Sequence, residues 1–297
     1  MWRNRESAEI REEKLIKKEE KAEKKKLEKE KKDQRREEKK QKKQEKRLKK
    51  ESVISEDNSE ILSQIQQNNP SLEQKKIICF DLYGTLIFRP HSHEKMKHYL
   101  KSVWIKPFKK YYEVIQTNKK EDVKSAYDSV DGFKMPSRAI RALQKHTDEE
   151  VKNTKIYPET LAVLKKLKNS WYKLALISNL SQDFEAPLRK LIPNDIFDYE
   201  ALSYDVWVTK PDEQIFNKIL RDANKDSNKW NAWDKYEAGE LIMVWDSKKS
   251  DVDWAKSAWM DAVLINRKAE KFTYDLEKQL ITIHTLTDLL DILWIDY

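Results

Sequence analysis

The sequence predicts an α/β fold, a doubly wound parallel sheet, because short apolar segments ending in polar residues alternate with helical patterns. Residues 77–80, 174–177 and 241–244 are such apolar segments and indicate buried strands. Asp81 directly follows the first segment, and Asp246 lies just beyond the third. In an open parallel sheet, reactive groups collect beyond the carboxyl ends of the strands. We therefore expect these carboxylates to share one edge of the sheet.

The order of strands along the chain follows from the same pattern. A helical pattern over 159–169 lies between the first two apolar segments. A further segment begins at Tyr199. The final part, 281–293, indicates a short strand and a closing helix. The expected parallel strands lie near 76–81, 173–178, 199–202, 241–245 and 262–266.

Four short motifs follow these segments in order. They are Asp81-Leu82-Tyr83-Gly84-Thr85-Leu86, Ser178-Asn179, Lys210-Pro211-Asp212, and Asp246-Ser247 through Asp251-Val252. In this order they resemble the signatures of the haloacid dehalogenase-like (HAD) hydrolase superfamily, in the subfamily with a helical cap. The resemblance covers residues 75–297. It implies an α/β core made of 75–90 and 156–297, with the helical cap, 91–155, inserted after the first strand.

The N-terminal segment, 1–50, has a different composition from the rest of the chain. The first 51 residues carry a net charge of +9, whereas the rest of the chain carries −1. Glu and Lys recur four residues apart, which supports a helix, but the apolar positions hold no heptad. We expect a charged single helix or a disordered tail, which could contact an anionic partner, joined by a linker, 51–74.

Cysteine content and hydropathy limit the possible locations of the protein. Cys79 is the one cysteine, so a disulfide within the chain is impossible. No apolar run of 18 residues occurs, and the N-terminus is charged rather than signal-like. A cytoplasmic protein without a membrane span is expected, and the near-neutral core gives no indication of nucleic-acid binding.

The resemblance implies a Mg²⁺-dependent hydrolase that acts on a small phosphate ester. Asp81 would be the nucleophile, forming an aspartyl-phosphate intermediate, and Lys210 would offset the clustered carboxylates. By the same resemblance, Thr85, Ser178 and Asn179 would bind the phosphate. Mg²⁺ would be held by Asp81, the backbone carbonyl of Tyr83, Asp246 and Asp251. All-oxygen ligation is what this hard cation prefers.

Tyr83 departs from the pattern of the family's phosphatases, which have Asp two residues after the nucleophile. A phenol is a poor proton donor near neutral pH. The family's dehalogenases have tyrosine at this position, so a 2-haloacid dehalogenase is an alternative. However, both Asp246 and Asp251 are present, and no arginine occurs between Arg89 and Arg138 to bind a haloacid. A non-catalytic scaffold that keeps the fold is a third alternative.

Tryptophan occurs where the resembled motifs have glycine. The chain has 10 Trp and 3 Gly, against an ordinary glycine usage of about 7%. The positions concerned are Trp171, Trp207, Trp245, Trp254 and Trp259. Some bacterial lineages decode UGA as glycine, and we hypothesise that these tryptophans are such codons. The alternative is that the tryptophans are genuine and pack a core.

Overall fold

The computed structural model describes residues 58–89, 137–227, 235–246 and 260–296, together with single positions between 114 and 125. The chain divides into two units at residue 59, and the described residues from 60 onward belong to the second. The expected N-terminal helix or tail, most of the expected cap, and the site residue Asp251 lie outside the described residues. Across the described residues, no helix is long and apolar enough to cross a membrane.

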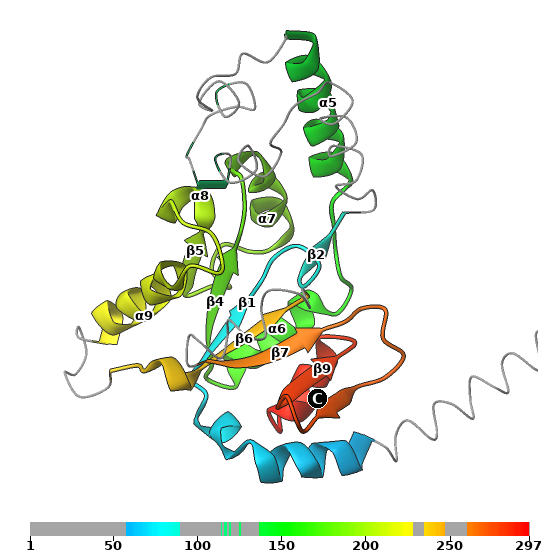
Figure 1. The fold of residues 1–297 in the computed structure, drawn as a ribbon, viewed down its shortest axis with the longest axis vertical. Helices are drawn as coiled ribbons and strands as arrows, with labels where there is room; N and C mark the ends of the chain where they lie inside the picture. The colour runs from blue at the N-terminus through cyan, green and yellow to red at the C-terminus, as the bar shows by residue number, and fades with distance from the viewer. Residues whose placement is uncertain are drawn as a thin grey trace, which may run out of the picture. The chain divides into compact units, whose positions relative to one another are not determined.

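A seven-stranded sheet forms the centre of the second unit (Figure 1). Its strand order is β5-β4-β1-β6-β7-β9-β8, and every neighbouring pair is parallel except the antiparallel pair β8–β9. The strands are β1 (Ile77–Phe80), β4 (Lys173–Ser178), β5 (Tyr199–Leu202), β6 (Leu241–Trp245), β7 (Asp261–Ile265), β8 (Thr273–Asp275) and β9 (Leu280–Ile283). The predicted α/β class and the five parallel strands are confirmed.

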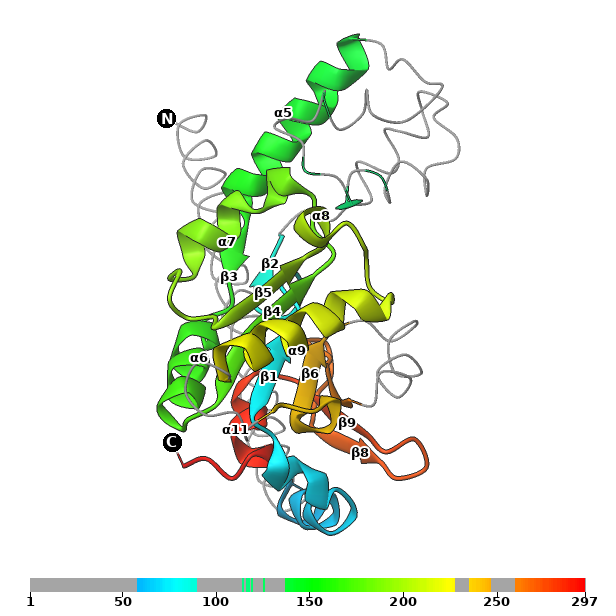
Figure 2. The ribbon, with the colours of Figure 1, turned by 90° about the vertical axis from the view of Figure 1, so that its left-hand side faces the viewer.

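The helices cover both faces of the sheet (Figures 1 and 2). Side chains of a strand alternate between its two faces, so Ile78 and Phe80 join one core cluster, whereas Ile77 and Cys79 join the other. Helices α6 (Thr160–Asn169), α7 (Ala186–Leu191) and α11 (Thr287–Ile292) pack in the first cluster. Helix α9 (Glu213–Ser227) packs in the second, while the short α8 (Ser203–Val206) and η3 (Ala238–Glu240) precede α9 and β6.

The segment expected to be a linker packs against the core over its C-terminal part. Residues 58–68 are helical, and a 3-10 helix, η1 (Pro70–Gln74), follows. Ile65 and Leu72 are fully buried in the first core cluster. The expectation of a linker as far as residue 74 is therefore wrong for 60–74, because two apolar side chains of this polar stretch are buried in the first core cluster.

A two-stranded ribbon connects the core to helix α5 (Ser137–Asn153), which lies within the range expected for the cap. The ribbon pairs β2 (Ile87–Phe88) with β3 (Lys155–Ile156) in antiparallel register, Ile87 opposite Ile156. Because the ribbon begins six residues after Asp81 and β3 follows the end of α5, the C-terminal end of α5 lies close to the loop that follows β1 (Figure 1). The remaining 3-10 helix, η2 (Gln182–Phe184), contacts the same region.

Three tryptophans adopt a left-handed backbone conformation. The φ angles are 71° at Trp171, 66° at Trp207 and 52° at Trp294. Trp171 and Trp207 are 94% and 72% exposed. Trp245 differs, because it ends β6 with its side chain buried and is not among the positive-φ residues. Trp254 and Trp259 lie outside the described residues.

Candidate active site

Two carboxylates lie at the carboxyl ends of neighbouring central strands. Asp81 follows β1 and Asp246 follows β6, and these strands pair in register with Phe80 opposite Val244. The Asp81 backbone N–H donates to Val244 O at 2.9 Å, which continues the ladder up to the loop that follows β1. Gly84 has a φ of 89°, and a Cβ added there would overlap the Asp246 carboxylate. The loop therefore needs glycine for its conformation and for this close approach.

Lys210 is paired with Asp81. Its Nζ lies 2.8 Å from Asp81 Oδ1 and donates to Ile177 O at 3.1 Å. The two side chains are 12% and 16% exposed, so water screens the pair only weakly. The structure thus brings together the residues expected to be the nucleophile and its cation, although 129 positions separate them.

Asn179 holds the backbone of Lys210 with its side-chain amide. Its Oδ1 accepts from Lys210 N at 2.6 Å, and its Nδ2 donates to Lys210 O at 3.0 Å. The sequence indicated substrate binding for Asn179, through its backbone. The structure adds a positioning role for its side chain, which the sequence alone could not reveal.

Two hydroxyl groups expected to bind phosphate are buried beside the nucleophile. Thr85 lies in the loop after β1, and Ser178 ends β4, the strand next to β1. Both residues are buried. Among the described residues, Thr85 Oγ1 finds no hydrogen-bond partner. A buried hydroxyl without a partner is costly, so an oxygen-rich ligand at this loop would stabilise it.

Tyr83 lies in the same loop, but its side chain is engaged by other residues. Its hydroxyl donates to Phe184 O at 3.2 Å, and its ring meets that of Phe184 edge-on, with centroids 6.2 Å apart. Arg89 Cζ lies 4.4 Å from the Tyr83 ring centroid. Burial raises the pKa of Tyr83 to about 12, although the positive charge of Arg89 partly opposes the shift. The phenol is therefore protonated and fixed in place.

Arg267 is a residue of this site that the sequence analysis missed. It follows β7 by two positions, and its Nη2 donates to Thr85 O at 2.6 Å. Its Nη1 pairs with Glu159, and its Cζ lies 3.7 Å from the Tyr157 ring centroid. Arg267 thus joins the loop after β1, residues 81–86, to the start of α6. We call 81–86 the nucleophile loop, because Asp81 is the expected nucleophile. Its position just beyond an expected strand, at the same sheet edge, was the available signal.

Gln116 is a second missed residue, and it comes from the range expected for the cap. Its Nε2 donates to Asn179 O at 3.2 Å, and the side chain is buried. A polar group of the insertion therefore touches the second motif directly. No local pattern in the sequence distinguishes Gln116 from the other polar residues around it.

The donors present suit Mg²⁺, although the full expected ligand set is not described. The carboxylates of Asp81 and Asp246 offer hard oxygen donors at adjacent strand ends. Because Gly84 has no side chain, the loop leaves space for the Asp246 carboxylate, which a Cβ at position 84 would overlap. Asp251 lies outside the described ranges. Within these ranges, no group of three or more His, Cys, Asp or Glu side chains is arranged to hold a metal ion.

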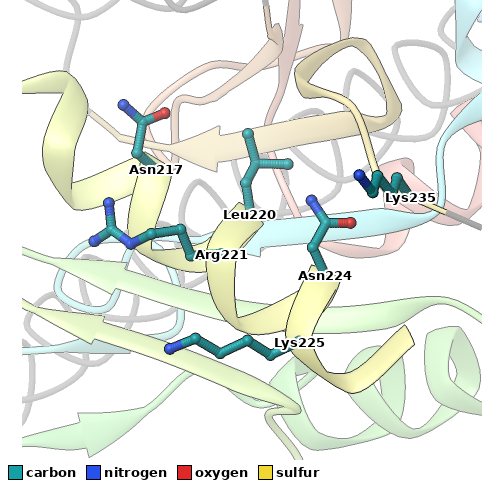
Figure 3. A pocket seen from close by; sticks show the side chains of 6 residues that line it. All are labelled: Asn217, Leu220, Arg221, Asn224, Lys225 and Lys235. Carbon is teal, nitrogen blue, oxygen red and sulfur yellow. The ribbon is translucent and has the colours of Figure 1, made fainter. Parts of the chain in front are cut away.

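A separate hollow lies on helix α9 (Figure 3). Its volume is about 570 Å³, and its lining is polar and basic, with Leu220 as the apolar member. The lining residues are Asn217, Leu220, Arg221, Asn224, Lys225 and Lys235. None of the residues predicted for the site belongs to this set, so the hollow is distinct from the edge that carries Asp81.

Comparison with known proteins identifies the family. A family model described as haloacid dehalogenase-like hydrolase matches residues 75–258, more than half of the chain. No curated protein matches significantly. Among solved structures, the chain is similar to a HAD phosphatase from Thermococcus onnurineus, with 22% identity over 74% of this chain and 99% of that chain and a TM-score of 0.45.

Two further structures show similarity at the same level. A 2-haloacid dehalogenase from Pseudomonas syringae pv. tomato is 20% identical over 74% of this chain and 98% of that chain, with a TM-score of 0.47. A HAD-family enzyme from Bacteroides thetaiotaomicron, solved with magnesium and inorganic phosphate, is 17% identical over 66% and 96%, with a TM-score of 0.46. On the match of the family model, this chain belongs to the haloacid dehalogenase-like hydrolases.

Proposed function

We propose that this protein is a Mg²⁺-dependent phosphatase that uses Asp81 as its nucleophile. The observation that carries the proposal is the ion pair of Asp81 with Lys210, next to Asp246 on the adjoining strand end. A carboxylate held by a lysine keeps a free oxygen for attack, and a second carboxylate beside it adds negative charge that favours a cation.

The reaction proceeds in two displacements. An Asp81 oxygen forms a bond to phosphorus while the bond from phosphorus to the leaving oxygen breaks, and the electron pair stays on that oxygen. Water then attacks the aspartyl phosphate, releasing phosphate and the Asp81 carboxylate. Lys210 stays beside the nucleophile, and the buried hydroxyls of Thr85 and Ser178 bind phosphoryl oxygens.

Mg²⁺ would be held by Asp81 and Asp246, together with the Tyr83 carbonyl and Asp251. When bound, it would neutralise charge on the phosphoryl group. The Lys210 ammonium offsets the negative charge of Asp81, a carboxylate that the cation would also contact. Asn179 keeps Lys210 in place through two hydrogen bonds to its backbone.

The test is phosphate release from p-nitrophenyl phosphate. We expect turnover with Mg²⁺, loss of turnover with EDTA, and recovery when Mg²⁺ is restored. Asp81→Asn should abolish turnover, whereas Asp275→Asn, at the end of β8, should not change it. Turnover that survives EDTA would contradict the role of the metal, and turnover that survives Asp81→Asn would contradict the nucleophile.

A 2-haloacid dehalogenase is the second candidate, and tyrosine at position 83 favours it. A halide leaves without a proton, so the fixed phenol would be no obstacle. Against it, Arg89 is engaged with Glu150 at 3.2 Å and stacks on Tyr83. Chloride release from 2-chloropropionate without added metal would reverse the order of the two candidates. If neither substrate is turned over, and the wild type and Asp81→Asn bind the same partner equally well, the non-catalytic scaffold alternative is supported instead.

A further inference from the structure

Tyr83 connects the nucleophile loop to the base of helix α5. Its hydroxyl donates to Phe184 O, its ring meets the Phe184 ring edge-on, and the Arg89 guanidinium lies within reach of both rings. Both the hydroxyl and the ring of Tyr83 are therefore in contact with residues outside the nucleophile loop.

The guanidinium above Tyr83 is itself fixed by α5. Arg89 Nη1 lies 3.2 Å from Glu150 Oε2, and the two side chains are 15% and 3% exposed. Arg89 Cζ also lies 5.1 Å from the Phe184 ring centroid. A buried ion pair of this kind holds its partners in one geometry, because separating them would leave a charge without compensation.

This arrangement bears on how the leaving group departs. An alkoxide needs a proton as its bond to phosphorus breaks, whereas a carboxylate leaves as a stable anion. The proton of Tyr83 is donated to Phe184 O, and Lys210 Nζ is shared between Asp81 and Ile177 O. Within the part of the chain that the structure describes, these two possible proton donors beside Asp81 are thus committed to structural contacts.

We propose that Tyr83 is a positioning residue that couples the nucleophile loop to α5, and that the substrates are acyl phosphates, whose leaving group departs as a carboxylate. The proposal rests on the phosphatase function proposed above. Asp81 attacks phosphorus, the bond between phosphorus and the acyl oxygen breaks, and the electron pair leaves with the carboxylate. No proton transfer is required in this step.

The test compares kcat/KM for acetyl phosphate, p-nitrophenyl phosphate and glycerol 3-phosphate in the wild type and in Tyr83→Phe. We expect the wild type to favour acetyl phosphate over glycerol 3-phosphate by a factor on the order of 10²–10⁴, the usual contribution of an acid catalyst. Tyr83→Phe keeps the ring, so this preference should not change. Tyr172→Phe, at the end of α6, is the control for loss of a phenol.

Two results would overturn the proposal while leaving the phosphatase function intact. One is equal turnover of acetyl phosphate and glycerol 3-phosphate. The other is a selective loss of glycerol 3-phosphate turnover in Tyr83→Phe, which would make Tyr83 the proton donor. Release of phosphate from none of the three substrates would instead refute the phosphatase function. Glu150→Gln tests the coupling separately, and it should raise KM and lower kcat for all substrates alike.

A second inference rests on the backbone at the ends of three helices. After α6, Trp171 N donates to Lys168 O at 3.1 Å and Tyr172 N to Leu167 O at 3.2 Å. After α11, Trp294 N donates to Asp291 O at 3.2 Å and Ile295 N to Leu290 O at 2.9 Å. Both pairs of bonds form the Schellman motif, in which the left-handed position is usually glycine.

The third helix end follows the related left-handed cap. Trp207 terminates α8, and its N–H donates to Ser203 O at 2.8 Å. Positive φ is a genuine outlier for a bulky side chain. Three of the four tryptophans in the described residues occupy such positions, and Trp294 was not among those that motif comparison had indicated.

We infer that the natural chain carries glycine at positions 171, 207 and 294, encoded by UGA. Reading the codons and weighing the corresponding peptides from the native host tests this directly. UGA codons with glycine masses are expected, and UGG codons with tryptophan masses would overturn the inference.

In the tryptophan-containing protein, Trp171→Gly, Trp207→Gly and Trp294→Gly should each raise Tm by about 2–4 °C. The control Leu276→Gly, exposed and without positive φ, should not; an equal rise there would contradict the backbone argument.

Discussion

Replacing Lys210 by methionine is the perturbation whose outcome the structure specifies most fully. The substitution keeps an apolar stem of similar length and removes the ammonium that lies 2.8 Å from Asp81 Oδ1. Because both side chains are more than four-fifths buried, the Asp81 carboxylate would be left with little water to solvate it. Loss of one partner of a buried pair costs about 3–5 kcal/mol.

The remaining exposure of the pair places the expected loss near the lower limit, about 3 kcal/mol in the free energy of unfolding. For a protein of this size, that corresponds to a fall in Tm of about 6–12 °C. The measurement is urea unfolding followed by circular dichroism in metal-free buffer. Asp81→Asn combined with Lys210→Met should restore part of the loss, because no uncompensated charge remains.

Magnesium provides a second check on the same residue. A cation bound at Asp81 and Asp246 would replace the missing ammonium, so Lys210→Met should gain more stability from saturating Mg²⁺ than the wild type does. A site at 100 times its Kd contributes about 2.7 kcal/mol. If Lys210→Met unfolds within about 0.5 kcal/mol of the wild type, or if its loss adds to that of Asp81→Asn without coupling, the buried-pair reasoning is refuted.

Other substitutions test the loop and its support. Gly84→Ala should lower the free energy of unfolding by about 1–2 kcal/mol, because alanine disfavours the left-handed backbone. It should also raise the Mg²⁺ concentration needed for activity, because the added Cβ would displace the Asp246 carboxylate. Unchanged urea and Mg²⁺ titrations would contradict both effects. Burial acts to raise the pKa of Glu159, but the hydrogen bond and positive charge of Arg267, together with backbone hydrogen bonds, outweigh it, so the folded-state pKa lies below 4.5. The resulting stability is present above the unfolded pKa and is lost as pH falls through the folded one. Tm should therefore fall more steeply below about pH 4.5 in the wild type than in Glu159→Gln, and parallel curves would disprove the pairing. Arg267→Lys should lower kcat more than it changes KM, because its contact with the Thr85 carbonyl positions the nucleophile loop; an effect confined to KM would count against that role.

The central strands could be predicted because their signal is local. A strand with both faces covered needs a nearly continuous run of apolar side chains. β1, β6 and the interior of β4 meet that requirement with segments that stand out from a highly charged chain. The shared position of Asp81 and Asp246 followed, because parallel strands bring their carboxyl ends to one edge, whereas Lys210 was assigned to the site by the resemblance of its motif. Short or exposed elements were missed. β2 and β3 have two residues each, and β8 is exposed or half-buried throughout.

The contacts that define the site depended on residues far apart in the chain. Arg267 meets Thr85 across 182 positions, and Tyr83 meets Phe184 across 101. Such partners leave no periodic pattern, since a single polar side chain after a strand is common in surface loops. The same limitation applies to Ile65 and Leu72, whose burial beneath the sheet is not apparent in a polar stretch.

By itself, the sequence determined the family, the α/β class, the main strands and the edge where the carboxylates gather, because hydrophobic periodicity and motif order are properties of neighbouring residues. The tertiary structure alone decided what each side chain does there. It showed that the Asn179 amide holds Lys210, that Arg267 supports the nucleophile loop, and that the Tyr83 phenol is tied to Phe184 and Arg89. These roles depend on distances between atoms that only folding brings together, and on burial that makes each contact strong.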